Sequence, residues 1–175
     1  MTNLLVVSDS SSLILATKAG LLEVVCKEFT VEIPETVFEE TVIAGKKLQK
    51  TDAFKIEEAI QENKILVKKV KPRKEKKEEQ WFKEFNIDKG EEEAIKLYIQ
   101  TKADLLLVDD KQAINTARLL EINWVTVPTL IVEFTKKQKI TKKQALESLR
   151  TVQEEGRYKL DFILEAMNEI EKING

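Results

Sequence analysis

Histidine is missing from this sequence, and cysteine occurs once, as Cys26. The absence of histidine excludes Ser-His-Asp and Cys-His catalysis and the usual zinc sites. A single cysteine excludes a disulfide within the chain. Any chemistry at neutral pH must therefore come from carboxylates, alone or with a hard cation that prefers oxygen ligands.

Long apolar runs are also missing. No stretch is long enough to span a membrane, and the start lacks a basic segment with a cleavage site, so we expect a cytoplasmic protein. The net charge is −2, and attraction to a nucleic acid would have to come from a local basic patch. With 175 residues, the chain is expected to form one domain with a substantial core.

Apolar runs alternate with helical patterns over most of the chain. Strands are predicted at residues 3–8, 29–33, 64–70, 104–109 and 123–128. Continuous apolar strands separated by helices are typical of a parallel sheet covered on both faces. The sequence thus predicts an α/β fold, a three-layer α/β/α sandwich with about five parallel strands, plus C-terminal helices. Breaks are expected near Gly20 and at Gly45, where a helix that follows the second strand should stop.

The chain after Pro128 is predicted to be helical. Thr141 and Gln144 form the pattern of a capping box, and the helix they begin should stop at Gly156. A further helix carries one apolar stripe, made of Ile163, Ala166, Met167, Ile170 and Ile173. We divide the chain into a domain of residues 1–134 and an extension of residues 135–175, packed on the same domain or on a partner.

Carboxylates follow two of the predicted strands. Asp9 ends the first strand and Asp109 ends the fourth, so both side chains emerge at the same edge of a parallel sheet. If these two strands are neighbours, the two carboxylates meet, and right-handed crossovers favour that arrangement. The crevice at such a switch is the usual ligand site. The alternative is that Asp9 or Ser10 only caps the next helix.

Two further acids are expected to face this crevice. Glu40 shares a helix face with the apolar Val37, and Glu91 begins the helix before the fourth strand. For Glu91 the alternative is a capping box with Asp88. Four converging carboxylates would repel one another and raise at least one pKa unless a divalent ion bound. Ligation by oxygen alone favours Mg²⁺ or Mn²⁺.

The order and spacing of these segments resemble the PIN domain family of nucleases, especially its VapC-like toxin relatives. The resemblance spans residues 4–134 and rests on "SDSSSLI", "IPETVFEET" and "DKGEEEAIKLYIQTKADLLLVDD". It implies that residues 1–134 form a PIN-like nuclease domain with four catalytic acids, Asp9, Glu40, Glu91 and Asp109. Asp9, Glu91 and Asp109 would hold Mg²⁺ or Mn²⁺. Ser11, Glu93 and Asp110 are auxiliary candidates, and Glu93 replaces Glu91 if the helix starts later.

The resemblance also implies a function. The expected activity is endonucleolytic cleavage of single-stranded RNA by a metal-activated water, in the toxin of a toxin–antitoxin pair. An antitoxin protein and a second copy of the chain are the expected protein partners. Two alternatives remain open at this point: a phosphotransferase or phosphatase with an aspartate nucleophile, and a PIN-like module that binds RNA or protein without catalysis.

A basic run at residues 68–77 is a candidate for holding RNA. Lys71, Arg73 and Lys74 would contact phosphates, with the aromatic residues Trp81, Phe82 and Phe85 as stacking platforms. The same stretch contains glutamates, and a run of mixed charge is usually solvated surface. Lys111 and Arg118, on the helix after Asp109, are alternative phosphate contacts.

Overall fold

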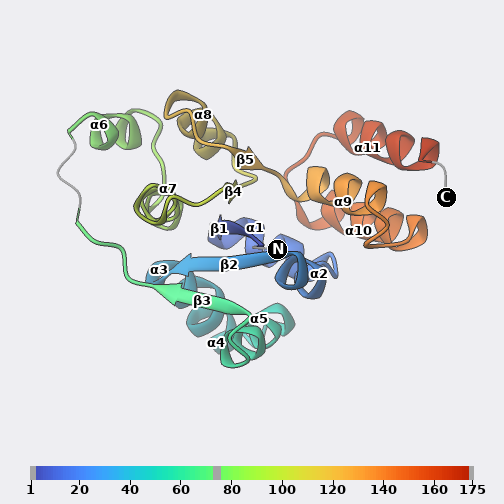
Figure 1. Cartoon of the computed structure of the whole chain (residues 1–175), viewed down its shortest axis with the longest axis horizontal. Coiled ribbons are helices and arrows are strands. Elements are labelled where there is room, and N and C mark those ends of the chain that lie inside the picture. Colours follow the sequence, from blue (N-terminus) through green and yellow to red (C-terminus); the bar gives the residue numbers. More distant parts are fainter. Residues whose placement is uncertain (1–2, 73–75, 174–175) are drawn as a thin grey trace.

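The sheet is fully parallel, as the sequence predicts. A computed structural model of the chain describes residues 3–72 and 76–173. Its strands are β1 (Leu4–Ser8), β2 (Phe29–Pro34), β3 (Ile65–Lys68), β4 (Leu105–Leu107) and β5 (Trp124–Val125). They are arranged in the order β3-β2-β1-β4-β5 (Figure 1). The prediction that β1 and β4 are neighbours is confirmed, since Val7 of β1 pairs with Leu106 of β4.

Helices cover both faces of this sheet. Those before β4 are α1 (Ser10–Lys18), α2 (Leu22–Glu28), α3 (Glu35–Phe38), α4 (Gly45–Lys47), α5 (Thr51–Gln61), α6 (Lys76–Glu84) and α7 (Lys89–Thr101). Those after β4 are α8 (Lys111–Leu119), α9 (Val127–Lys136), α10 (Lys142–Glu155) and α11 (Leu160–Lys172). Val6 belongs to one buried cluster and Val7 to another. Because successive side chains of a strand alternate between its faces, the predicted three-layer α/β/α sandwich is confirmed.

The prediction that Gly45 ends a helix is wrong. Helix α3, the π-helical turn η1 (Glu39–Ala44) and α4 follow one another without a break, and Gly45 lies inside this run. A Cβ atom on Gly45 would lie 2.7 Å from the Cβ of Ala53 in α5. The glycine therefore allows two helices to pack closely. The break predicted near Gly20 is present, where the backbone has a φ of 75° between α1 and α2.

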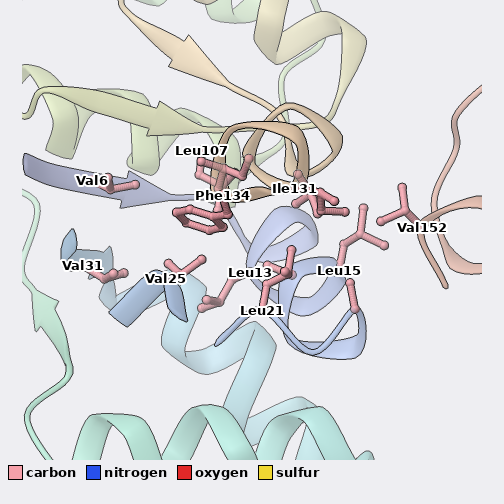
Figure 2. Packing of buried hydrophobic residues seen from close by; sticks show 14 of the residues in the cluster. Val6, Leu13, Leu15, Leu21, Val25, Val31, Leu107, Ile131, Phe134 and Val152 are labelled. Atoms are coloured by element: carbon pink, nitrogen blue, oxygen red, sulfur yellow. The ribbon is translucent and has the colours of Figure 1, made fainter. Parts of the chain in front are cut away.

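The C-terminal helices pack on the rest of the chain. Val152 of α10 lies in the same cluster as Leu15 of α1 (Figure 2). Ile163, Ala166 and Ile170 of α11 are buried in that cluster too. Three residues of the apolar stripe of α11 are thus covered by the chain's own core, and Met167 and Ile173 pack against it while partly buried. Among the described residues, no helix has the length and apolar character needed to cross a membrane.

Candidate active site

A cavity of about 510 Å³ opens beside the carboxyl ends of β1 and β4. Helices α1, α7 and α8 and the link between α10 and α11 form its walls. The lining residues are Ser10, Ser11, Ile14, Leu15, Lys18, Asp88, Glu91, Asp109, Asp110, Lys111, Glu155, Gly156, Arg157 and Tyr158. Asp9 precedes Ser10 and is 1% exposed. The structure therefore brings most of the predicted acids to one place.

Only one of the two carboxylate oxygens of Asp9 accepts hydrogen bonds within the described part of the chain. Its Oδ1 accepts the backbone N–H of Ser12 at 2.9 Å and the hydroxyl of Ser11 at 3.5 Å. Asp9 is thus the N-cap of α1, the role considered as an alternative from the sequence. Its Oδ2 is buried and has no hydrogen-bond partner in the described part of the chain. Capping leaves one oxygen for a ligand.

In Asp109, too, one carboxylate oxygen accepts hydrogen bonds and the other has no partner in the described part of the chain. Its Oδ1 accepts the backbone N–H of Val127 at 3.0 Å and also the hydroxyl of Tyr158. Its Oδ2 is buried and lacks a partner within residues 3–72 and 76–173. Buried polar oxygens are rarely left without a donor or a cation. Oδ2 of Asp9 and Oδ2 of Asp109 follow the neighbouring strands β1 and β4, and the unpartnered Oγ of Ser12 lies at the start of α1 beside Asp9. This group of buried oxygens indicates a ligand site.

Glu91 and Glu93 point to different places. Glu91 lines the cavity and forms the predicted capping box with Asp88, whose Oδ1 accepts the N–H of Glu91 at 2.8 Å. Glu93 instead accepts a hydrogen bond from the hydroxyl of Thr36 in α3. Glu93 is not part of the cavity wall. The geometry favours Glu91 as the third acid, although the same side chain also caps its helix.

Glu40 lies next to the cavity without lining it. Its carboxylate accepts a hydrogen bond from the hydroxyl of Ser10, which does line the cavity. Gly90 at the start of α7 makes room for it, since a Cβ there would lie 2.6 Å from Oε2 of Glu40. Glu40 thus reaches the edge of the site from η1, through one hydroxyl.

The auxiliary candidates Ser11 and Asp110 both line the cavity. Asp110 caps α8, because its Oδ1 accepts the backbone N–H groups of Gln112 at 2.7 Å and Ala113 at 3.2 Å. Its negative charge adds to the field around Glu91. Asp110 is thus both a structural cap and part of the acidic wall.

Burial raises the pKa of three acids in the site. The pKa of Asp9 rises from 3.8 to about 7, and that of Asp109 rises to about 6. The pKa of Glu91 rises to about 8, first through burial and then through the charges of Asp88, Asp110 and Asp9. The sequence predicted raised pKa values from mutual repulsion. The direction is confirmed, but loss of contact with water is the larger cause.

The residues present fit a hard divalent cation. The donors are all oxygens, and the unpartnered Oδ2 atoms of Asp9 and Asp109 are atoms that such an ion would satisfy. In the described part of the chain, no three acidic side chains are already gathered at ligand geometry. A third ligand such as Glu91 would therefore have to shift when an ion binds.

A family model described as a PIN domain matches residues 5–172. The chain belongs to the PIN domain family. The match confirms the resemblance seen in the sequence and indicates a nuclease, and it extends from β1 through α11. A search of curated proteins found no match.

The structure separates the predicted RNA contacts of this PIN domain. Lys111 lines the cavity, whereas Arg118 lies over the ring of Trp124, 5.3 Å from its centroid, and outside the cavity wall. Lys71 is exposed and also lies outside the wall. Arg73 and Lys74 lie outside the described residues.

The aromatic residues near the basic run do not all have a free face. Phe82 is 3% exposed and has the ammonium group of Lys96 over its ring, so its prediction as a stacking platform is wrong. Trp81 and Phe85 are partly buried. The aromatic residues near the basic run therefore expose fewer ring faces for stacking on RNA bases than the sequence indicates.

Sequence reasoning missed the wall that the C-terminal helices add to the PIN domain. Tyr158 donates to Asp109 from 49 positions away in the sequence. Lys18 and Arg157 line the same part of the cavity. A single tyrosine two residues after a glycine carries no local signal of this contact, so only the packing of α10 and α11 reveals it.

Proposed function

We propose that this PIN domain is a Mg²⁺- or Mn²⁺-dependent endoribonuclease that cuts single-stranded RNA. The observation that carries the proposal is the pair of buried, unpartnered oxygens on Asp9 and Asp109, which follow neighbouring parallel strands. A cavity large enough for a nucleotide lies beside them. Membership of a family of nucleases supports the same reading.

Asp9, Asp109 and Glu91 would hold the ion. When bound, a divalent ion supplies an activated water as nucleophile and neutralises charge on the scissile phosphate. The chain's own contribution is to orient these ligands. Ser12 fixes one oxygen of Asp9, and Val127 with Tyr158 fixes one oxygen of Asp109.

Glu40 is the fourth acid of the proposed site. Because its carboxylate accepts a hydrogen bond from the hydroxyl of Ser10, it fixes the direction of that hydroxyl at the cavity wall. Ser11 and Asp110 also line the cavity, and Lys111 on the same wall would contact a phosphate. Glu93 is held by Thr36 and is left out of the catalytic set.

A cleavage assay with a matched set of variants tests the proposal. The parent should cut single-stranded RNA with Mg²⁺ or Mn²⁺, stop when EDTA is added, and leave 5′-phosphate and 3′-hydroxyl ends. Asp9→Asn and Asp109→Asn should lose activity by orders of magnitude and bind the metal more weakly in calorimetry. Asp52→Asn, a change of a buried carboxyl in α5, is the control and should retain activity.

The outcomes separate the alternatives. Equal cutting by the parent and both site variants would identify a contaminating nuclease. A parent that neither binds metal nor cuts RNA would favour a binding module. A phosphorylated Asp9 or Asp109 in mass spectra would favour a phosphotransferase or phosphatase.

We further propose that the chain acts in the cytoplasm as the toxin of a toxin–antitoxin pair. The support is the similarity of its motifs to VapC-like toxins. An antitoxin or a second copy would have to bind a surface other than the buried stripe of α11. Induced expression in bacteria should arrest growth, and the Asp109→Asn variant should not. Light scattering of the purified chain tests for a homodimer.

A further inference from the structure

One side of the cavity carries none of the proposed metal ligands. Residues 155–158, the end of α10 and the start of its link to α11, form this side together with Ile14, Leu15 and Lys18 of α1. We call residues 155–158 the C-terminal wall. The wall adjoins the acids, since Tyr158 contacts Asp109, and it adds an arginine and an aromatic ring to the lining of the cavity.

The C-terminal wall is held in place by tight contacts. A Cβ atom on Gly156 would lie 2.5 Å from the carbonyl oxygen of Val152 and 3.2 Å from the ring of Tyr158. The hydroxyl of Tyr158 donates to Asp109. The ring of Tyr158 stacks on that of Phe162 in α11, with centroids 5.4 Å apart and planes 16° from parallel. The wall is thus built onto the acidic site.

Two groups at this wall remain open to a ligand. Lys18 is paired with Glu155 at 2.5 Å, whereas Arg157 is exposed and makes no ion pair with any described residue. Phe162 is 43% exposed. It extends the aromatic surface from Tyr158, which lines the cavity, toward solvent.

These groups match the parts of a nucleotide. The acids repel phosphates, so a phosphate next to the scissile one needs a cation nearby, and the guanidinium of an arginine binds phosphate with two donors. An exposed aromatic ring stacks on a base of any identity, provided that the base is not already stacked in a duplex.

We propose that the C-terminal wall binds the nucleotide adjoining the scissile phosphate of unpaired RNA. Arg157 contacts its phosphate, and the Tyr158–Phe162 pair supports its base through the exposed ring of Phe162. This inference rests on the proposed ribonuclease function and adds a subsite to it. It would also give the proposed enzyme a preference for single-stranded over duplex RNA.

RNA binding in EDTA tests the subsite without any cleavage. We suggest fluorescence anisotropy of a short labelled single-stranded RNA with the full chain. Arg157→Gln should weaken binding about tenfold and reduce the salt slope of log K by about 0.7, the loss of one phosphate contact. Phe162→Ala should weaken binding about tenfold with an unchanged salt slope.

Two variants serve as matched controls. Arg150→Gln removes the same charge from an exposed position of α10, and Leu164→Ala removes an apolar side chain of α11 that is 46% exposed. Neither residue lines the cavity. Both variants should bind RNA as the parent does. The proposal is overturned if Arg157→Gln and Arg150→Gln behave alike, or if Phe162→Ala and Leu164→Ala do. It is also overturned if duplex RNA shows the same loss with Phe162→Ala.

The same experiments distinguish failure of the proposed subsite from failure of the proposed ribonuclease function. Loss of RNA binding in Arg157→Gln and Phe162→Ala, with no metal-dependent cleavage by the parent, would support the wall and reject the catalytic function. Metal-dependent cleavage by the parent, with RNA binding unchanged in both variants, would reject the wall alone.

Discussion

Replacing Asp9 with asparagine should stabilise the metal-free protein, by an amount that increases with pH. Burial, with the charges of Asp109 and Asp88, raises the pKa of Asp9 from 3.8 to about 7. Between these two values the folded state binds a proton that the unfolded state has released. Stability therefore falls as the pH rises through this window. Asparagine keeps an acceptor for the N–H of Ser12 and carries no charge.

The size of the effect follows from the pKa change. One pKa unit corresponds to about 1.4 kcal/mol, so a charged Asp9 destabilises the folded chain by about 4 kcal/mol once the pH exceeds its folded pKa. At about pH 5 only about 1.6 kcal/mol of this penalty is present. The asparagine Nδ2 is left buried without a partner, at a cost of about 1–3 kcal/mol at any pH.

The two contributions nearly cancel at about pH 5, and at about pH 8 the variant should be more stable by about 1–3 kcal/mol. For a chain of this size that is roughly 2–12 °C in Tm. Thermal melting in EDTA at both pH values measures it, with Asp52→Asn as the control for loss of a buried carboxyl elsewhere. A difference in Tm that does not change with pH, or that becomes smaller as the pH rises, would refute the reasoning.

Binding of Mg²⁺ or Mn²⁺ should make the parent more stable than the Asp9→Asn variant. Mg²⁺ or Mn²⁺ binds the folded parent and raises its Tm through ligand linkage, and the Asp9→Asn variant should gain less. Because the ion must replace protons on Asp9 and Glu91, whose pKa values are about 7 and about 8, the apparent metal affinity of the parent should increase between about pH 6 and 8. Calorimetry across this range measures it.

The strands of the sheet could be predicted because each has a pattern contained in a few consecutive residues. Each strand is a short apolar run, and the crossover rule then places β1 beside β4. Gly45 shows where local reasoning fails. A glycine after a helical pattern usually ends a helix, but here its lack of a side chain allows contact with Ala53 of another helix. That contact depends on packing that no local pattern describes.

The acidic residues also differ in whether the sequence alone can locate them in the site. Asp9 and Asp109 could be located because a residue that ends a parallel strand has its position fixed by the sheet. Glu91 and Glu93 both lie in the first turns of α7, and only the hydroxyl of Thr36 separates their roles. Tyr158 joins the site from the last part of the chain. Its hydrogen bond exists because α10 packs on α1 and α11 packs on α9 and α10.

Three further predictions concern single contacts, two at the site and one between helices away from it. Gly90→Ala should lower cleavage by up to about 100-fold with little change in Tm, because its Cβ would displace only the flexible end of Glu40. Gly45→Ala should instead lower stability and leave cleavage unchanged. Its Cβ would lie 2.7 Å from the rigid Cβ of Ala53, so melting should show a free energy of unfolding lower by about 1–3 kcal/mol, with the cleavage rate per folded molecule unchanged. Tyr158→Phe removes a donor to Asp109, and a donor to a carboxylate stabilises its charged form, so the pKa of Asp109 should rise further above about 6. Cleavage by this variant should therefore fall more at about pH 6 than at about pH 8, where Asp109 is ionised in both proteins. A pH–rate profile that keeps its midpoint would show that the hydroxyl of Tyr158 has no influence on the acid.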